Sequence, residues 1–296
     1  MPILTVENLY KNYGTVQALK NVSFTVPPGS VFGILGPNGS GKTTLLGIIM
    51  DVLKASKGNF KLFDKEPTSD QRKQIGTLLE TPNFYHYLSG QKNLEIAAAI
   101  KGISFTDIPR VLEIVNLTQR KDSKFSTYSL GMKQRLAIGS CLLGDPQVMV
   151  FDEPTNGLDP VGIAEIRELI KKLYHNGKTI IMASHLLDEV EKVCTHVAIL
   201  KRGELITTGN VNEILANEDI IELGSDDNEK LLLILKSLNN YTNVKEADGL
   251  VQLFYPVGAA DLAAINKHCF NNGIVLKHLT IKKKSLEAKF FELTNN

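Results

Sequence analysis

The sequence predicts an α/β fold with a mainly parallel sheet, followed by a smaller α+β domain at the C-terminal end. The apolar run Val31–Leu35 continues through a glycine-rich loop into an apolar helical segment that begins near Lys42. This order of strand, loop and helix is typical of the first unit of a doubly wound sheet. In the second half of the chain, strand and helix patterns alternate. The expected strands cover 148–151, 178–183 and 196–200, and the expected helices cover 161–175 and 186–193.

The remaining segments place further elements around this sheet. Residues 1–26 alternate apolar and polar positions, which predicts two strands joined by a turn at Gly14. Apolar residues at helical spacing predict a helical subdomain over about 85–145. We expect a first domain over 1–218 and a second over 219–296, where the pattern is β-α-β-α-β with a terminal helix over 285–294. This second domain carries no catalytic constellation, so we expect a packing or dimerisation role.

Composition and charge exclude several classes of protein. The 296 residues include 33 Lys+Arg and 32 Asp+Glu, a net charge of +1, which argues against a broadly basic nucleic-acid-binding chain. The three cysteines are far apart, as expected for a reduced cytosolic protein without a disulfide framework or zinc site. The longest charge-free stretch, 21–41, holds five glycines and three prolines and therefore predicts strand and loop, not a membrane helix. We also expect no signal peptide.

The glycine-rich loop matches the phosphate-binding pattern G-x-x-x-x-G-K-[ST]. Glycines let the backbone fold so that successive N–H groups face phosphate oxygens, and the following helix presents its positive end to the same anion. A lysine then reaches the outer phosphates and a hydroxyl residue binds Mg²⁺. The predicted nucleotide-binding residues are Gly36, Pro37, Asn38, Gly39, Ser40, Gly41, Lys42, Thr43 and Thr44.

Two acids and a histidine follow other strands of the predicted sheet. The apolar strand 148–151 ends in Asp152 and Glu153, and His185 comes shortly after the strand 178–183. Neighbouring residues on a strand point to opposite sides, so the two acids can take different roles. We expect Asp152 to hold Mg²⁺ and Glu153 to activate the attacking water, with His185 contacting the γ-phosphate or that water.

Residues 1 to about 220 resemble the ATPase subunit of an ATP-binding cassette (ABC) transporter, with the motifs in the expected order. By this resemblance, Tyr13 stacks on adenine, Tyr128–Met132 occupies the place of the signature LSGGQ, and 156–159, ending in Asp159, forms the D-loop. The resemblance implies a P-loop NTPase cassette. Such a cassette has a RecA-like core with an antiparallel β subdomain and a helical subdomain, and it hydrolyses ATP with Mg²⁺.

The resemblance also implies partners. Ser129 and Gly131 precede the helical segment that starts near Lys133, and in the family this signature covers the γ-phosphate bound by a second cassette. ATP therefore joins two cassettes, identical or different, and hydrolysis releases them. Separate transmembrane permease subunits would hold the pair at the cytoplasmic face of the plasma membrane. No nucleic-acid partner is expected.

The chain departs from the family pattern at two places. Tyr128, Leu130 and Met132 replace residues of the signature, and Glu80 stands where most of the family has glutamine. We expect Glu80 to contact Mg²⁺ or its water and to change the coupling to the permease. Both departures resemble bacitracin and lantibiotic-immunity exporters. The aromatic segment 82–90 fits either a groove for a coupling helix of the permease or part of the core.

Two alternative functions are weaker. A soluble ABC ATPase that acts on nucleic acid or ribosomes would carry a coiled-coil arm or two cassettes, and this chain has a single uninterrupted cassette without a basic tract. A P-loop kinase or GTPase would leave the signature, the D-loop and His185 without roles. An ATP-driven antibiotic or lantibiotic exporter subunit is therefore the preferred hypothesis.

Overall fold

The computed structural model describes residues 1–79, 84–215, 219–247, 249–256 and 258–283, together with Leu286 and Phe290. Its contacts divide the chain into two compact units, Met1–Gly209 and Asn210–Asn296. The sequence pattern predicts a boundary between residues 218 and 219 instead.

An antiparallel sheet begins the first unit. Strands β1 (Leu4–Tyr13) and β2 (Val16–Val26) form a hairpin, and β4 (Lys57–Leu62) pairs with the other edge of β1. The turn of the hairpin contains Gly14 at φ +56°, a left-handed conformation that favours glycine. The expected pair of N-terminal strands is therefore confirmed.

The second sheet of this unit has the strand order β5-β6-β7-β3-β8-β9. The strands are β3 (Val31–Leu35), β5 (Ile75–Leu78), β6 (Val148–Asp152), β7 (Thr179–Ser184), β8 (His196–Lys201) and β9 (Glu204–Asn210). β3 pairs in parallel with β7 and β8, and β6 pairs in parallel with β5 and β7, which confirms the α/β fold. In register, Leu35 lies opposite Ser184 and Asp152 opposite Ala183, so the carboxyl ends of the three central strands meet at one edge.

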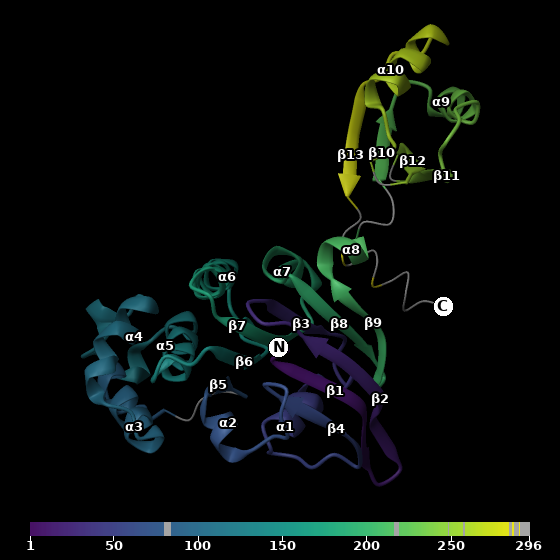
Figure 1. The fold of residues 1–296 in the computed structure, drawn as a ribbon. Helices are drawn as coiled ribbons and strands as arrows, with labels where there is room; N and C mark the ends of the chain where they lie inside the picture. The colour runs from purple at the N-terminus through teal and green to yellow at the C-terminus, as the bar shows by residue number, and fades with distance from the viewer. Residues whose placement is uncertain are drawn as a thin grey trace. The chain divides into compact units, whose positions relative to one another are not determined.

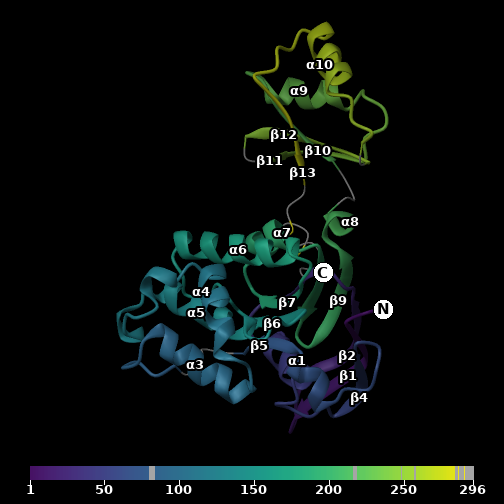
Figure 2. The ribbon, with the colours of Figure 1, turned by 60° about the vertical axis from the view of Figure 1, so that its left-hand side comes forward.

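Helices cover both faces of this parallel sheet, as Figures 1 and 2 show. Helix α1 (Lys42–Ile49) lies on one face, and its apolar side chains share a core with those of both sheets. Helices α6 (Pro160–His175) and α7 (Leu187–Val193) lie on the other face. The buried side chains of α6 include Ile166, Leu169, Ile170 and Leu173, the spacing of one amphipathic face.

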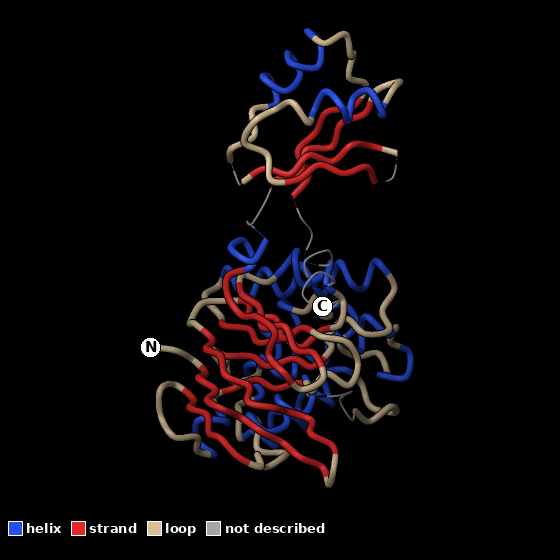
Figure 3. Tube along the Cα trace, turned by 90° about the vertical axis from the view of Figure 1, so that its right-hand side faces the viewer, coloured by secondary structure: helices blue, strands red, loops and turns tan. Residues whose placement is uncertain are grey.

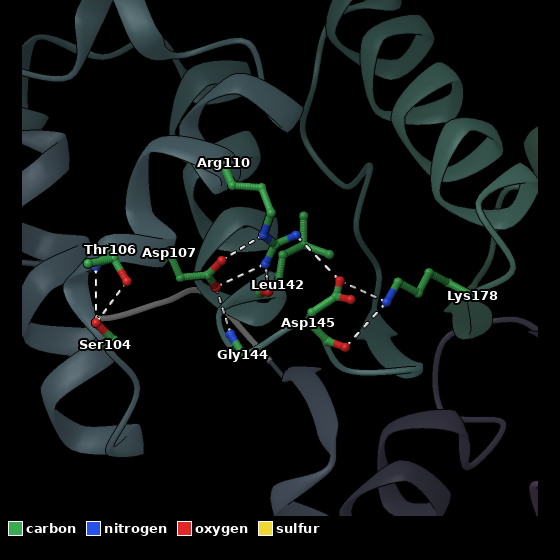
Figure 4. A network of polar contacts seen from close by, with 8 residues as sticks. All are labelled: Ser104, Thr106, Asp107, Arg110, Leu142, Gly144, Asp145 and Lys178. Carbon is green, nitrogen blue, oxygen red and sulfur yellow. Dashed lines mark hydrogen bonds and ion pairs between the residues drawn. The ribbon is translucent and has the colours of Figure 1, made fainter.

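The segment expected to be helical contains α3 (Gly90–Lys101), α4 (Ile108–Ile114) and α5 (Leu130–Leu142), while α2 (Ser69–Lys73) precedes β5. A polar network ties this subdomain to the sheet, as Figure 4 shows. Arg110 binds Asp107 through Nε (2.6 Å) and Nη2 (2.9 Å), and it also donates to the carbonyl of Leu142 (2.9 Å). Oδ1 of Asp145 accepts hydrogen bonds from Nη1 of Arg110 (3.4 Å) and from Nζ of Lys178 (2.8 Å). Lys178 is buried and directly precedes β7. The network therefore fixes α4 and the end of α5 beside the amino-terminal edge of the sheet.

The C-terminal unit is a small sheet with helices on one face (Figure 3). After α8 (Val211–Leu215) come β10 (Asp219–Gly224), α9 (Asn228–Leu235), β11 (Asn243–Ala247), β12 (Leu250–Tyr255), α10 (Leu262–Asn271) and β13 (His278–Lys283). The order β11-β12-β10-β13, with every neighbouring pair antiparallel, is the ferredoxin-like split βαβ arrangement.

The pattern predicted from the sequence, β-α-β-α-β, does not include the strand β11 that the structure contains. This edge strand contains Lys245 and Glu246 and is mostly exposed, so it has little of the apolar alternation that marks a strand. The terminal helix expected over 285–294 lies mostly outside the described residues.

No helix among the residues described here has both the length and the apolar character that crossing a bilayer requires. The charge-free stretch 21–41 forms the end of β2, the whole of β3 and the following loop, as expected.

Candidate nucleotide-binding and hydrolysis site

The loop between β3 and α1 has a backbone that requires glycine. Gly39 and Gly41 have φ values of +79° and +105°, and Gly36 has +156°. A Cβ at Gly41 would lie 2.6 Å from the carbonyl oxygen of Ala18, so a side chain there would both strain and displace the backbone. Gly41 is also the N-cap of α1, whose first N–H groups have no partner within the helix. The loop therefore leads directly to a helix end that attracts anions.

Lys42 lies inside this loop with its side chain only 6% exposed. Its Nζ donates hydrogen bonds to the carbonyl oxygens of Gly36 (2.8 Å) and Pro37 (3.4 Å). The same Nζ is 3.3 Å from Oε1 of Glu153, which follows β6. The ammonium group thus sits at the loop and is neutralised by a carboxylate from another strand.

Glu153 connects Lys42 to His185. Its Oε2 lies 2.8 Å from Nδ1 of His185, and its backbone N–H donates to the carbonyl of Ala183 (3.0 Å). Glu153 has a φ of +48°, a conformation uncommon outside glycine, which the surrounding sheet edge holds in place. The structure therefore brings Lys42, Glu153 and His185 together, as the ends of neighbouring parallel strands predict.

A cleft of about 750 Å³ opens beside the loop. Its lining comes from the start of β2, from the loop and α1, from Glu153 and from the turn between β8 and β9. These residues are Thr15, Val16, Gln17, Ala18, Lys20, Asn38, Gly39, Ser40, Gly41, Lys42, Thr43, Thr44, Glu153 and Arg202. Within the described structure, the buried Oγ of Ser40 has no hydrogen-bond partner. A cradle of this size, with cations and backbone amides, fits a polyphosphate.

The residues present also fit a magnesium ion that arrives with the nucleotide. Thr43 is exposed in the first turn of α1, and Asp152 ends β6 with 8% of its surface exposed. Across the part of the chain that the structure describes, no group of three or more His, Cys, Asp or Glu side chains could hold a metal. Mg²⁺ usually takes one or two protein oxygens and completes its shell with phosphates and water, so this is no obstacle. Glu80, the third predicted ligand, lies outside the described residues.

Tyr13 is the last residue of β1 and is not one of the residues that line the cleft. It is 46% exposed, and Nζ of Lys11 lies 4.9 Å from the centre of its ring. Its close neighbours Thr15 and Val16 do line the cleft.

The signature and D-loop residues are helix caps that lie next to each other, away from this cleft. Ser129 caps α5 by accepting the N–H of Met132 (3.2 Å), and Asp159 caps α6 by accepting the N–H of Gly162 (2.9 Å). A Cβ at Gly131 would lie 3.8 Å from Cα of Gly162. The two segments therefore form one surface that does not reach the nucleotide cleft of its own chain.

Tyr128, which departs from the signature pattern, has a structural role. Its hydroxyl donates to the carbonyl of Arg120 (2.7 Å), and a Cβ at Gly90 would overlap that hydroxyl. Burial raises the pKa of the Tyr128 hydroxyl. The tyrosine thus packs inside the helical subdomain and leaves Ser129 at the surface.

In the aromatic segment beyond residue 83, one side chain belongs to the core and two are exposed, as a groove for a coupling helix would require. Phe84 packs edge-on against the buried Phe125, with ring centres 5.1 Å apart, which is a core contact. Tyr85 and Tyr87 are 48% and 69% exposed and contact each other. Residues 82 and 83 lie outside the described part of the chain.

Known proteins share this arrangement. A sequence model of the ABC transporter family matches residues 19–156. The bacitracin transport ATP-binding protein BcrA of Enterococcus faecalis is 34% identical over 297 residues, covering 98% of this chain and 96% of that protein. This chain is an ABC transporter ATP-binding subunit. The lantibiotic transport ATP-binding protein SrtF of Streptococcus pyogenes is 34% identical over 226 residues, 74% of the ABC subunit described here and 99% of SrtF.

Solved structures agree with this assignment. The ADP conformation of MJ1267, an ATP-binding cassette of an ABC transporter, superimposes with a TM-score of 0.66 at 29% identity, covering 73% of this chain and 95% of that one. The ABC subunit is therefore an ATP-hydrolysing cassette of a family whose members bind adenine nucleotides and work in pairs with transmembrane permeases. The kinase, GTPase and soluble ATPase hypotheses are not favoured.

Some residues of the cleft belong to no sequence motif. Lys20, Gln17 and Arg202 line it, and the N–H of Gly203 donates to the carbonyl of Ser40 (3.1 Å). The turn between β8 and β9 contains no recognisable motif and is distant in sequence from the phosphate loop, so only the folded structure shows that the two are in contact. Lys11 does not line the cleft but contacts the ring of Tyr13. That contact could have been anticipated, because residues two apart on a strand share a face.

Proposed function

We propose that this ABC subunit powers a bacterial exporter of antibiotic or lantibiotic peptides. The observation that carries the ATP-hydrolysing part of the proposal is the bridge from Lys42 through Glu153 to His185 at the end of the parallel sheet. The similarity to BcrA over nearly the whole chain and to SrtF over most of it supports the class of exported molecule. The subunit would lie at the cytoplasmic face of the plasma membrane, bound to separate permease chains.

We assign the chemistry to the following groups. The loop residues 36–44 bind the β- and γ-phosphates, with Lys42 exchanging its contact with Glu153 for the arriving anion. Thr43 and Asp152, together with Glu80, would hold Mg²⁺, which when bound neutralises charge on the phosphates. Glu153 accepts a proton from the attacking water, and His185 orients the carboxylate through the 2.8 Å contact with Oε2.

The surface formed by Ser129, Gly131 and Asp159 would close the site of a second cassette. Ser129 and the start of α5 offer a hydroxyl and a helix N-terminus to the γ-phosphate held by the other subunit. We propose that Tyr13 stacks on the adenine and that the exposed Tyr85 and Tyr87 contact a coupling helix of the permease.

The phosphate loop is tested by Lys42→Ala, with Lys172→Ala on α6 as the matched control. We expect Lys42→Ala to lose ATP binding in calorimetry, while the control binds as the native protein does. Unchanged ATP affinity in Lys42→Ala would refute the assignment of the loop.

The exporter is tested in cells that carry the subunit together with any multi-span membrane protein encoded beside its gene, which would be the permease. Copurification of the two chains and a raised inhibitory concentration of bacitracin or a lantibiotic are expected; Glu153→Gln should abolish the resistance and leave the copurification intact. If no permease copurifies, the transport assignment fails, whereas resistance to neither peptide overturns only the class of exported molecule.

A further inference from the structure

Lys11 and Tyr13 lie two residues apart on β1, so their side chains project from the same face of the strand. Nζ of Lys11 is 4.9 Å from the centre of the Tyr13 ring, within the range of a cation–π contact. The same Nζ donates a hydrogen bond to the carbonyl oxygen of Lys54 (2.7 Å). The ammonium group is therefore held against the ring and is not free in solvent.

The partner of Lys11 belongs to the segment between α1 and β4. There, the N–H of Asn12 donates to Oγ of Ser56 (3.0 Å), and the N–H of Ser56 donates to the carbonyl of Tyr10 (2.8 Å). This segment follows the helix that begins at the phosphate loop. The end of β1 is thus fastened to the segment that connects α1 to β4.

The ring of Tyr13 is nearly half exposed, although Lys11 occupies one of its sides. Tyr13 pairs with Val16 across the hairpin, and Val16 lines the nucleotide cleft. We propose that Lys11 is a positioning residue that holds the Tyr13 ring in the orientation in which its free face receives adenine. The proposal rests on the adenine-stacking role assigned to Tyr13 above.

Two physical effects support this role. An exposed tyrosine at a strand end can adopt several χ1 rotamers, and a fixed cation on one face selects one of them before the base arrives. The cation also draws electron density toward its own side of the ring, which makes the opposite face more attractive to an electron-rich purine. Both effects act on the base and neither acts on the phosphates.

The experiment compares ADP with inorganic pyrophosphate, because the two ligands share a diphosphate and differ in the nucleoside. Dissociation constants are measured by calorimetry for Lys11→Met, Lys11→Arg, Tyr13→Ala and the control Lys57→Met on β4. Lys11→Met should weaken ADP binding by about 2- to 5-fold, the range for an exposed cation–π contact, and leave pyrophosphate unchanged. Lys11→Arg should retain native affinity, as should Lys57→Met.

A second readout uses the absence of tryptophan from the sequence. Tyr13→Trp introduces a fluorophore whose emission should be quenched by ADP and not by pyrophosphate. Adding Lys11→Met should reduce the quenching at saturation, because fewer molecules hold the ring in the stacking orientation.

The outcomes distinguish the positioning role of Lys11 from the adenine-stacking role of Tyr13. Equal weakening of ADP and pyrophosphate by Lys11→Met would mean that Lys11 only supports the fold, and would overturn the proposal. Weakening by Tyr13→Ala without any effect of Lys11→Met would also overturn it. If Tyr13→Ala itself leaves ADP affinity unchanged, the adenine-stacking role fails, and the inference about Lys11 fails with it.

Discussion

Replacing Glu153 by glutamine separates the electrostatic role of this carboxylate from the role in hydrolysis that we propose for it. Glutamine keeps the shape of the side chain but removes the negative charge that faces Lys42 at 3.3 Å and His185 at 2.8 Å. We expect Glu153→Gln to bind ATP at least as tightly as the native subunit, because Lys42 no longer has an ion pair to give up. Hydrolysis should fall by roughly 10²- to 10⁴-fold, the usual contribution of a general base.

The same substitution should lower stability most when nucleotide is absent. The side chain of Lys42 is 6% exposed and that of Glu153 is 20% exposed, so the pair is largely shielded from water. A hydrogen bond to a charged group contributes about 1.5–3 kcal/mol, and partial exposure of Glu153 reduces this to about 1–2 kcal/mol. For a domain of this size, that loss corresponds to a fall in Tm of roughly 2–8 °C. Bound ATP restores a negative partner to Lys42, so the difference from the native protein should shrink at saturating nucleotide.

Thermal unfolding with and without ATP, together with phosphate release, measures both effects. Glu168→Gln on α6 is a suitable control, because its carboxylate is 67% exposed and pairs only at the surface with Lys171 and Arg167. Native-like phosphate release by Glu153→Gln would refute the role of Glu153 in hydrolysis. An unchanged Tm in the nucleotide-free state would refute the electrostatic argument.

Three further predictions concern other parts of the subunit. Gly41→Ala should abolish nucleotide binding and cost more than about 2 kcal/mol of unfolding free energy, whereas Gly14→Ala, which meets no atom within 4 Å, should cost about 1 kcal/mol. Hydrogen bonds from Arg110 hold the pKa of Asp107 below its usual value. That stabilisation is present above the unfolded-state pKa and is lost as the pH falls through the folded-state pKa. In urea unfolding below about pH 4, the free energy of unfolding should therefore fall more steeply with decreasing pH in the native protein than in Asp107→Asn. Glu80→Gln should retain ATPase activity and change peptide resistance in cells; unaltered resistance would remove the special role of Glu80.

The parts of the fold that follow local patterns were predictable from the sequence. β3 is buried at every residue, and α6 repeats its apolar residues at helical spacing, so each has a clear local signal. Lys42, Glu153 and His185 were also predictable as a group, because residues that follow parallel strands of one sheet gather at its carboxyl edge.

Features that depend on contacts between distant segments were not predictable. Asp107, Arg110, Asp145 and Lys178 carry no motif, and only the fold brings them into one network. Tyr128 was assigned to a surface signature, yet the position of Arg120 and the absence of a side chain at Gly90 create a site for it in the interior.

The order of strands in the parallel sheet has a consequence for how the enzyme is made. β3 carries the phosphate loop, but its neighbours on both sides, β7 and β8, are translated more than a hundred residues later. β7 must also insert between β3 and β6 before Glu153 and His185 can meet. With Glu153 and His185 in the roles we propose, a growing polypeptide on the ribosome cannot hydrolyse ATP until nearly the whole cassette has emerged, and a product truncated before β7 would be inactive.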